Sequence, residues 1–418
     1  MPDKALVVSF YFPPLNTPAT QHPAWFFEFM KDWGIDTTAV TSSVYFPGEA
    51  PEAPPADDII RVPVKYARRF WRQVYRAELL VQGHSGCWNP SFIWAEIAAR
   101  AAVRLLRNDR FSSMVSTSPT VASHWAGYRI KKRFPHLKWV ADFQDPFLGN
   151  PFAHSKPFVR PIERRLENAI FSAADFVSAN TNTVREMWQA RYPAWRDKFV
   201  VTWGGYDPRE TIAPLPLPAR PAPVLAHVGS IYHERAPNAL FEALGSLHRQ
   251  GKLGPGQLVV ELVGSNDLRA VENPAQLAGL QELGLVRLHE GHIPRSEALR
   301  ISEEADYLLV LDITGKFNTK LQVPSKLFDY VLIGRPIIAF TPRNSPTEYI
   351  LSRSGVPHVV IHNEGSPEDV EAGILRLLTL PPEPRPASPW FRETFDARQL
   401  AKSMAGLLAS SPSACERS

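Results

Sequence analysis

Short apolar runs alternate with helical stretches along this chain, and that alternation constrains its fold more than any other feature of the sequence. The first run, Ala5–Phe12, is almost entirely apolar and ends at Pro13-Pro14. Such runs are typical of strands that are buried on both faces of a parallel sheet. A helical stretch at Pro23–Trp33, with Gly34 as its C-cap, and a strand at Thr37–Thr41 follow. The order of strand, helix and strand predicts the α/β class.

The alternation runs through two parts of the chain, and a proline-rich stretch separates them. Five of the twelve residues of Ile212–Pro223 are proline, so this stretch cannot form a helix and predicts an extended linker over 206–223. The sequence therefore predicts two Rossmann-like domains, at 1–205 and 224–385. We expect them to face each other across a cleft, because ligands of open α/β sheets bind beyond the carboxyl ends of the strands.

The C-terminal segment Trp390–Leu408 is amphipathic and follows a second proline cluster. It predicts a helix within 386–409 that packs back on the N-terminal domain, before a polar tail at 410–418. Between these landmarks we expect helices at 91–107, 122–133, 159–173, 183–189, 237–248, 296–304 and 325–333, and strands at 113–116, 139–143, 176–179, 198–203, 224–228, 257–263, 286–289, 307–311, 336–340 and 358–361.

Composition limits the partners and the compartment. The chain has 46 basic and 42 acidic residues, a net charge of +4, and dedicated nucleic-acid binders concentrate far more positive charge, so we expect no nucleic-acid partner. Cys87 and Cys415 lie far apart, which argues against a disulfide framework and favours a reducing compartment. No run approaches the roughly 20 apolar residues of a membrane span, and the N-terminus does not resemble a signal peptide. We therefore expect a cytoplasmic protein.

A short motif follows the expected strand Val224–Val228. Gly229-Ser230 permits a tight turn before a helix that opens near Pro237. Backbone N–H groups at such a turn can cradle an anion, and Arg235 can add a bidentate phosphate contact. An ordinary strand-to-helix turn with a surface arginine explains the same residues, so both interpretations stay open at this point.

Lys326 and Asp329 lie in the first turn of an expected helix that begins at Pro324-Ser325 and ends at Gly334. A surface ion pair between Lys326 and Asp329 is one interpretation. It is electrostatically awkward, because a lysine at a helix N-terminus opposes the macrodipole. A phosphate bound there removes the conflict, since Lys326 and the helix N-terminus both attract it. Asp329 would then accept hydrogen bonds from sugar hydroxyls, and we favour this second interpretation.

Six segments, spread along almost the whole chain, match the motifs of a known enzyme family in their order and spacing. They are Tyr11–Pro14; Ser118-Pro119 with His124; Ala141–Pro146; Val228–Tyr232 with Arg235; Leu262–Gly264; and Val323–Tyr330 with Gly334–Pro336. Together they resemble the retaining, nucleotide-sugar-dependent glycosyltransferases of family four. These enzymes have the GT-B fold, in which two Rossmann-like domains face each other with a cleft between them.

The resemblance implies a role for each domain. The C-terminal domain would bind a nucleoside-diphosphate sugar, which is a donor substrate and not a cofactor. The implied donor residues are Gly229, Ser230, Arg235 and Lys326 at the diphosphate, Asp329 at the ribose, and Ile293 in the loop Gly291–Pro294 at the base. The N-terminal domain would bind the acceptor, through His124 and the loop Pro13–His22, which includes Pro14 and His22. Such enzymes need no metal, because basic side chains and a helix N-terminus offset the charge on the leaving diphosphate.

The sequence departs from the family pattern at three places. The family often has a pair of glutamates separated by seven residues, and Leu321 stands at the position of the first. The loop after Pro14 usually carries glycine, but residues 15–21 hold none, and His22 stands where arginine is common. The Asp-x-Arg-Asp pattern reads Asp142-Phe-Gln-Asp145. These changes affect donor geometry and acceptor choice more than the fold.

Two residues of the N-terminal domain have open roles. His124 is either a structural residue near a helix start or a catalytic contact with the sugar or acceptor. Retaining chemistry needs no strong general base, because the leaving phosphate can accept the acceptor's proton on the same face of the sugar. Asp145 either structures its loop or faces the acceptor. Asp142 and Asp145 lack the spacing of a metal-binding Asp-x-Asp pair, so no metal site is expected.

The stretch 64–80 combines five basic with four aromatic residues. As a helix it could lie on anionic lipid headgroups at the inner face of the membrane. A helix packed on the domain with solvated arginines explains it equally well. Peripheral membrane contact would suit a lipid-linked acceptor, by analogy with bacterial polysaccharide transferases.

The sequence thus predicts a glycosyltransferase for polysaccharide biosynthesis. It would move a sugar from a nucleoside-diphosphate sugar to a saccharide or lipid-linked acceptor, with retention and without metal. The alternatives are a two-domain ligand-binding protein without catalysis and a GT-B sugar-nucleotide epimerase. The sugar, the nucleotide and the acceptor depend on a few side-chain contacts that fold and motifs do not determine.

Overall fold

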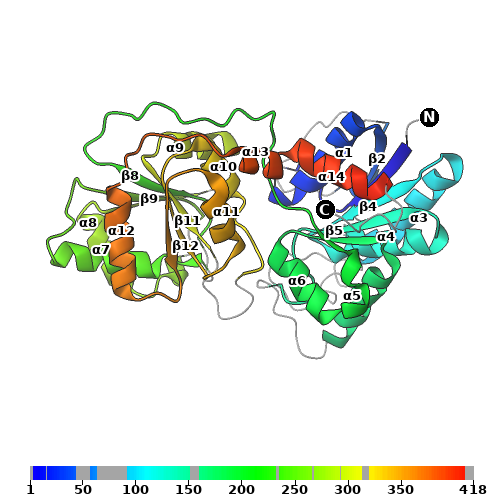
Figure 1. The fold of residues 1–418 in the computed structure, drawn as a ribbon, viewed down its shortest axis with the longest axis horizontal. Coiled ribbons are helices and arrows are strands. Elements are labelled where there is room, and N and C mark those ends of the chain that lie inside the picture. Colours follow the sequence, from blue (N-terminus) through cyan, green and yellow to red (C-terminus); the bar gives the residue numbers. More distant parts are fainter. Residues whose placement is uncertain are drawn as a thin grey trace. The chain divides into compact units, whose positions relative to one another are not determined.

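The chain folds into two compact units, each described here by itself. The computed structural model describes residues 3–15, 17–43, 57–63, 92–150, 160–231, 235–265, 268–291, 293–312 and 320–409. Unit 1 consists of Met1–Asp207 and Asp396–Ser418, and unit 2 of Pro208–Phe395. Figure 1 shows both units, each with a central sheet between layers of helices.

Within the described residues, unit 1 holds a seven-stranded sheet in the order β3-β2-β1-β4-β5-β6-β7, and every strand pairing is parallel. The five residues of β4 and the four of β6 are all buried, as is expected of inner strands in a sheet covered on both faces. The strands are β1 (Asp3–Ser9), β2 (Ile35–Ser42), β3 (Ile59–Val62), β4 (Ser113–Thr117), β5 (Lys138–Phe143), β6 (Phe176–Ala179) and β7 (Phe199–Val201).

Helices cover both faces of the unit 1 sheet (Figure 1). On one face, α1 packs against α14, and their apolar residues share a core with β1. On the other face, α4 packs between α3 and α5. Thr120 and Thr181 cap the N-termini of α4 and α6 through their hydroxyl groups. The helices are α1 (Gln21–Phe29), α3 (Phe92–Asn108), α4 (Val121–Arg133), α5 (Arg160–Ala173), α6 (Asn182–Arg191) and α14 (Ala397–Ala409).

Unit 2 holds a six-stranded parallel sheet within the described residues, in the order β10-β9-β8-β11-β12-β13. Counted from β8, this is the doubly wound order 3-2-1-4-5-6, whose direction reverses between β8 and β11. The strands are β8 (Val224–Val228), β9 (Val259–Gly264), β10 (Val286–Glu290), β11 (Tyr307–Leu311), β12 (Ile337–Thr341) and β13 (His358–His362).

Two groups of helices cover the unit 2 sheet. Helix α7 packs with α8 and α12 on one face, and α10 packs with α9 and α11 on the other. Gly334 ends α10 in the left-handed conformation, at φ 78°, where glycine is favoured. The helices are α7 (Asn238–Arg249), α8 (Pro274–Glu282), α9 (Arg295–Glu303), α10 (Lys326–Ile333), α11 (Pro346–Ser354), α12 (Pro367–Leu378) and α13 (Pro389–Phe395).

The predicted α/β class with two Rossmann-like domains is confirmed. Strand β3 and helices α8, α11 and α12 were absent from the prediction. In β3 only Val62 is buried, so its apolar signal is weak. In each unit all strands are parallel, and their carboxyl ends therefore meet at one edge of the sheet, where the predicted site residues follow the strands.

The predicted linker over 206–223 is extended, but from residue 208 onwards it belongs to unit 2. The backbone of Leu215 bonds to Glu303 and to the Arg335 guanidinium, and Arg220 pairs with Asp306. These contacts bind the stretch to α9 and to the start of β11. A proline-rich segment thus packs along its unit, because its carbonyl groups still accept hydrogen bonds.

The single C-terminal helix predicted within 386–409 is wrong, because two helices form and belong to different units. Helix α13 lies in unit 2 and α14 in unit 1. Asp396 interrupts them: its carboxylate accepts the backbone N–H of Arg398 at 2.7 Å, as an N-cap does, and its own backbone bridges to Tyr206. Within unit 1, α14 packs against α1.

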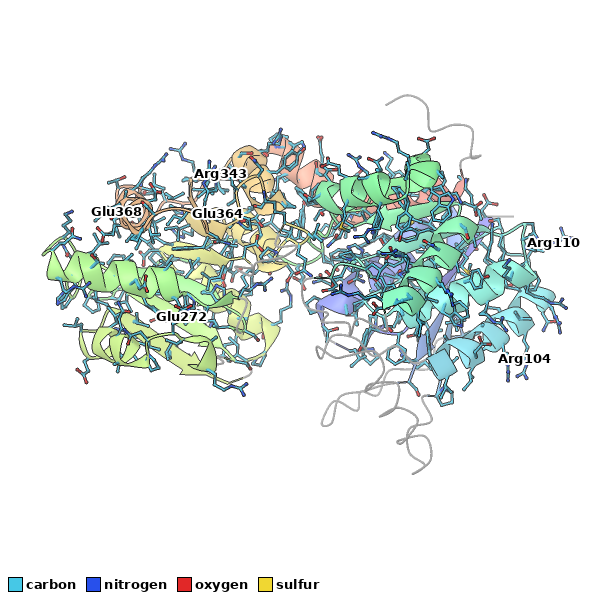
Figure 2. The ribbon with its side chains drawn as sticks, turned by 90° about the horizontal axis from the view of Figure 1, so that it is seen from below. Arg104, Arg110, Glu272, Arg343, Glu364 and Glu368 are labelled. Atoms are coloured by element: carbon cyan, nitrogen blue, oxygen red, sulfur yellow. The ribbon has the colours of Figure 1, made fainter. Side chains whose placement is uncertain are left out.

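Charged side chains of both units lie mostly at the surface, as is usual for folded proteins. Figure 2 shows Arg104 and Arg110 pointing outward at the end of unit 1, and labels the exposed Glu368, in the first turn of α12, and Glu364, just before that helix. None of the helices in the described part of the chain combines the length and the apolar composition needed to cross a bilayer. The basic and aromatic stretch 64–80, both cysteines and the tail 410–418 lie outside the described residues.

Candidate functional site

Two glycines close the turn that follows β8. Gly229 has φ 138° and donates its N–H to the Val263 carbonyl at 2.8 Å. Gly264, at φ 133°, lies directly against it, because a Cβ there would come within 2.9 Å of the Gly229 carbonyl. Side chains at either position would be strained. The turn therefore brings bare backbone to the carboxyl edge of the sheet, next to the reversal of strand order.

Lys326, the first residue of α10, reaches over this edge to β8. Its Nζ lies 2.9 Å from Nε2 of His227, which is completely buried. The Nδ1 of His227 is 2.9 Å from the Leu309 carbonyl, which can only accept. Nδ1 therefore carries the proton, and Nε2 accepts a hydrogen bond from Lys326. The sequence did not single out His227 as a site residue.

Arg235 adds a second positive charge beside Lys326. Burial, and then the charge of Arg235, lower the pKa of Lys326 well below its usual value. Burial, followed by the charge of Lys326, lowers the pKa of His227 and keeps it neutral. Among the described residues no carboxylate forms an ion pair with Lys326. We call Lys326, Arg235 and His227 the cationic cluster; two positive charges held together in this way favour an anion.

The cationic cluster encloses the Gly229 turn. A Cβ at Gly229 would lie 2.6 Å from Nζ of Lys326, so a side chain there would displace the lysine amine. Ser230, the next residue, is exposed at the same edge. The structure thus brings together four of the six predicted donor residues, namely Gly229, Ser230, Arg235 and Lys326.

The remaining two donor residues lie by α9 and α10. Asp329 comes three residues after Lys326 and is held by both Nη atoms of Arg295, at 3.1 and 3.2 Å. Arg295 also donates from Nε to Glu210, at 3.2 Å. Burial raises the pKa of Asp329, and Arg295 opposes this. Ile293 is half-buried two residues before Arg295, and its neighbour His292 lies outside the described residues.

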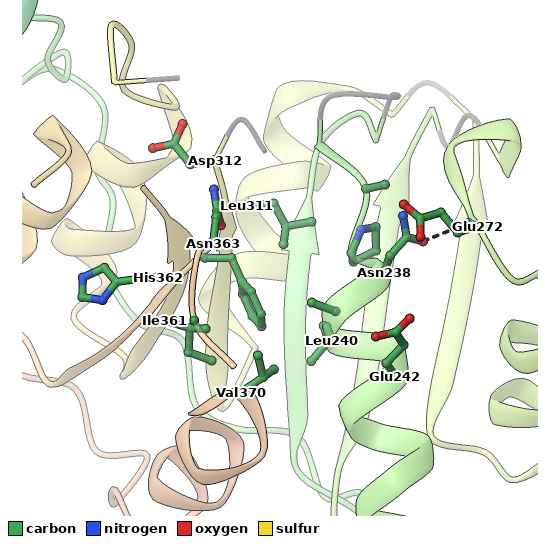
Figure 3. Close-up of a pocket in the computed structure, with 15 residues that line it drawn as sticks. Asn238, Leu240, Glu242, Glu272, Leu311, Asp312, Ile361, His362, Asn363 and Val370 are labelled. Carbon is green, nitrogen blue, oxygen red and sulfur yellow. Dashed lines mark hydrogen bonds between the residues drawn. The ribbon is translucent and has the colours of Figure 1, made fainter. Parts of the chain in front are cut away.

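A pocket of about 340 Å³ lies beyond the carboxyl ends of β11, β12 and β13, beside the N-terminus of α7 (Figure 3). Its floor is apolar, formed by Leu240, Leu311, Phe340, Ile361 and Val370. Glu242 and Glu272 line the rim, and no lysine or arginine is among the described residues that line it. None of the predicted donor residues lines it either. Electrostatics therefore favour the cationic cluster over this pocket as the position of a diphosphate.

The structure buries His124 in the core of unit 1. The side chain is completely inaccessible, stacks on Phe143 at 3.8 Å between ring centroids, and bonds through Nδ1 to Ser116 at 2.9 Å. Burial lowers its pKa to about 3, so it is neutral. A side chain with no exposed surface cannot contact a substrate without a local rearrangement. Of the two predicted roles of His124, its burial favours the structural one over the catalytic contact.

The predicted acceptor residues lie at the carboxyl edge of the unit 1 sheet. His22, in the first turn of α1, is nearly buried, and its Nδ1 is 3.1 Å from Asp142 at the end of β5. Ser178 donates to the other oxygen of Asp142, at 3.0 Å. Asp145 is half-buried just after β5, and Pro14 is half-buried after β1. In the described part of the chain, no group of His, Cys, Asp and Glu side chains is arranged to hold a metal ion.

Comparison of sequences finds no matching protein-family model and no matching curated protein. Solved structures match over almost the whole chain. They include the apo form of OtsA (TM-score 0.65, 13% identity, 98% of this chain and 99% of that chain) and the apo form of the lipopolysaccharide outer core galactosyltransferase WaaB (0.56, 14%, 97% and 99%). A third is the trehalose-6-phosphate protein from E. coli bound with UDP-2-fluoro glucose (0.60, 12%, 97% and 96%).

The likeness shows the fold. These structures are GT-B proteins, and the present chain shares their two Rossmann-like domains. The predicted resemblance to GT-B glycosyltransferases is confirmed at this level.

Proposed function

We propose that this chain is a glycosyltransferase that moves a sugar from a nucleoside-diphosphate sugar to a saccharide or lipid-linked acceptor. The observation that carries the proposal is the cationic cluster. Lys326 and Arg235 meet at the carboxyl edge of a doubly wound sheet, beside its reversal of strand order, where such sheets bind nucleotides. The fold shared with a galactosyltransferase and with a protein that binds a UDP sugar supports the same class of reaction.

The diphosphate would lie across the Gly229 turn. Bare backbone at Gly229 and Ser230 allows close approach, and the N-terminus of α10 adds its positive dipole. Lys326 and Arg235 contribute charge-assisted hydrogen bonds. Asp329 would accept hydrogen bonds from the ribose, and the loop containing Ile293 would hold the base.

The same cations would act in the chemical step. As the glycosidic bond to the diphosphate breaks, negative charge builds on the leaving oxygen, and fixed positive groups stabilise it. Lys326 and Arg235 can supply this stabilisation without a metal ion. Retention of configuration follows if the leaving phosphate accepts the acceptor's proton on the same face of the sugar. Acceptor contacts would come from unit 1, through Pro14, His22 and Asp145.

The test is a thermal-shift and calorimetric screen with UDP, GDP, ADP and CDP, followed by transfer assays with the matching sugar nucleotides. In Lys326→Ala we expect the Kd of the best nucleotide to rise at least about ten-fold, because a charge-assisted hydrogen bond is lost. Lys252→Ala, which removes an exposed lysine of the same unit, should leave the Kd unchanged.

Three results would contradict the proposal. Equal nucleotide affinity in Lys326→Ala and wild type would remove the site assignment. Conversion of the sugar nucleotide to an isomer without any acceptor would identify an epimerase instead. Tight binding of free sugars, with no nucleotide bound, would indicate a binding protein without transferase activity.

A further inference from the structure

Arg295 joins two carboxylates, and this arrangement bears on the donor site. Its Nη1 and Nη2 donate to the two oxygens of Asp329, at 3.1 and 3.2 Å, and its Nε donates to Glu210 at 3.2 Å. Arg295 is the first residue of α9, Asp329 lies in the first turn of α10, and Glu210 lies in the extended stretch before β8. Three separate segments of unit 2 therefore meet at one guanidinium.

The pairing fixes the direction of the Asp329 carboxylate. A planar guanidinium that bonds to both oxygens holds a carboxylate in one plane, which the point charge of a lysine does not. Each carboxylate oxygen has a second lone pair, so Asp329 can still accept two further hydrogen bonds. Its side chain is 17% exposed, so part of the group remains accessible.

The pairing also favours the ionised form of Asp329, against the larger effect of burial. Burial raises the pKa of this carboxyl group, and the hydrogen bonds and charge of Arg295 lower it. Glu210 is a second carboxylate on the same guanidinium, and its negative charge raises the pKa of Asp329 slightly further. An ionised carboxylate only accepts hydrogen bonds, which suits hydroxyl donors.

We infer that Arg295 is a positioning residue that aims Asp329 at the ribose hydroxyls of the donor nucleotide and thereby makes the site select ribonucleotides. The inference rests on the proposed function. A buried acceptor with a fixed direction rejects a ligand that lacks the matching hydroxyl, because the acceptor is then left unsatisfied. A carboxylate that can rotate loses this penalty, since it can turn toward water.

The test compares two ligands that differ only at the ribose. The first is whichever of UDP, GDP, ADP and CDP raises the melting temperature most, and the second is its 2′,3′-dideoxy form. For the wild type we expect Kd values that favour the ribonucleotide by about ten-fold or more. In Arg295→Met this ratio should fall to about two-fold or less, while affinity for the dideoxy form stays nearly constant.

Four variants complete the design. Arg295→Lys should restore little of the ratio, because lysine cannot hold both oxygens of Asp329. Asp329→Asn should lose the ratio as well, and adding Arg295→Met to it should change nothing further. Arg300→Met is the matched control: it removes an arginine of the same helix that pairs with Glu304 in an exposed ion pair, and should keep the wild-type ratio.

The outcomes separate this inference from the proposed function. If Arg295→Met or Arg295→Lys still binds nucleotide with the same ratio of dideoxy to ribo Kd values as the wild type, the inference is overturned and the proposed function stays intact. A wild type that binds the ribo and dideoxy forms equally would do the same. If the wild type binds none of the four nucleotides, both fall together.

Discussion

The amine of Lys326 has an unusual environment for a lysine. It is half-buried, lies beside the positive charge of Arg235 and donates a hydrogen bond to the neutral imidazole of His227. Its pKa is lowered by burial and by Arg235, from the ordinary value of 10.5. Between the lowered pKa and 10.5, the unfolded chain holds a proton on this amine that the folded chain has released. The contribution of Lys326 to stability therefore rises with pH across that window.

This behaviour gives a prediction for Lys326→Met without ligand. The variant cannot titrate, so its free energy of unfolding minus that of the wild type should be greatest at low pH and should decrease steadily as the pH rises toward 10.5. Urea unfolding of both proteins at several pH values measures the difference. A difference that stays constant with pH would show that the pKa of the amine is not lowered in the folded chain, and one that grows would show that this pKa is raised.

His124 should make the stability of the protein depend on pH in the acid range. Burial lowers its pKa from 6.5 to about 3, so the unfolded chain takes up a proton below pH 6.5 that the folded chain refuses. Stability from this residue is complete above 6.5 and is lost as the pH falls toward 3. His124→Gln, which never titrates, should flatten the acid-induced loss of stability in that window. An acid profile identical to wild type would contradict the buried, neutral histidine.

Sequence reasoning at the residue scale used the one local conflict that was visible. A lysine at a helix N-terminus opposes the helix dipole, and this pointed to Lys326 as an anion ligand. It failed where the partner lies far away in the chain. His227 is 99 residues from Lys326, and Arg295 is 34 residues from Asp329, so neither contact leaves a local pattern. The burial of His124 depends on Phe143 and Ser116, which only the folded sheet brings to it.

At the scale of elements, apolar runs predicted the buried strands well, because both faces of these sheets are covered by helices. β8 and β11, for example, form over the predicted residues, with every residue buried. The C-terminal helix was predicted as one element, because periodicity alone does not reveal a break. The break at Asp396 comes from its side chain capping α14 and from its bridge to Tyr206. The bridge to Tyr206 depends on the tertiary structure, so the helical periodicity of the sequence does not reveal the break.

Helix α14 offers a paired test of packing and propensity. Met404 is completely buried against α1, so Met404→Ala should cost about 2–5 kcal/mol of stability through lost contacts and a cavity. Gly406 lies two residues on, and a Cβ there meets nothing within 4 Å. Gly406→Ala should therefore stabilise the helix by about 0.5–1 kcal/mol. Chemical denaturation monitors both, and a neutral Met404→Ala would show that α14 adds little to the unit 1 core.

At the scale of the whole molecule, the two units bury separate cores. The described core of unit 2 draws only on residues between Leu225 and Leu377, and that around β1 and α14 draws only on residues of unit 1. A unit with its own apolar core can unfold as a cooperative body. Each unit has its own parallel sheet, with its predicted site residues at the carboxyl edge, so the proposed donor and acceptor residues are divided between the two units.

This division predicts how a nucleotide acts on stability. All proposed donor residues lie in unit 2, so a nucleoside diphosphate should stabilise that unit alone, by about 2.7 kcal/mol at a hundred times its Kd. In calorimetry, one of two transitions should move upward and the other should stay. Hydrogen exchange should assign the moving transition to residues 208–395. Equal protection of both units would mean that the bound nucleotide contacts unit 1 as well, and the donor site would then need residues from both sheets.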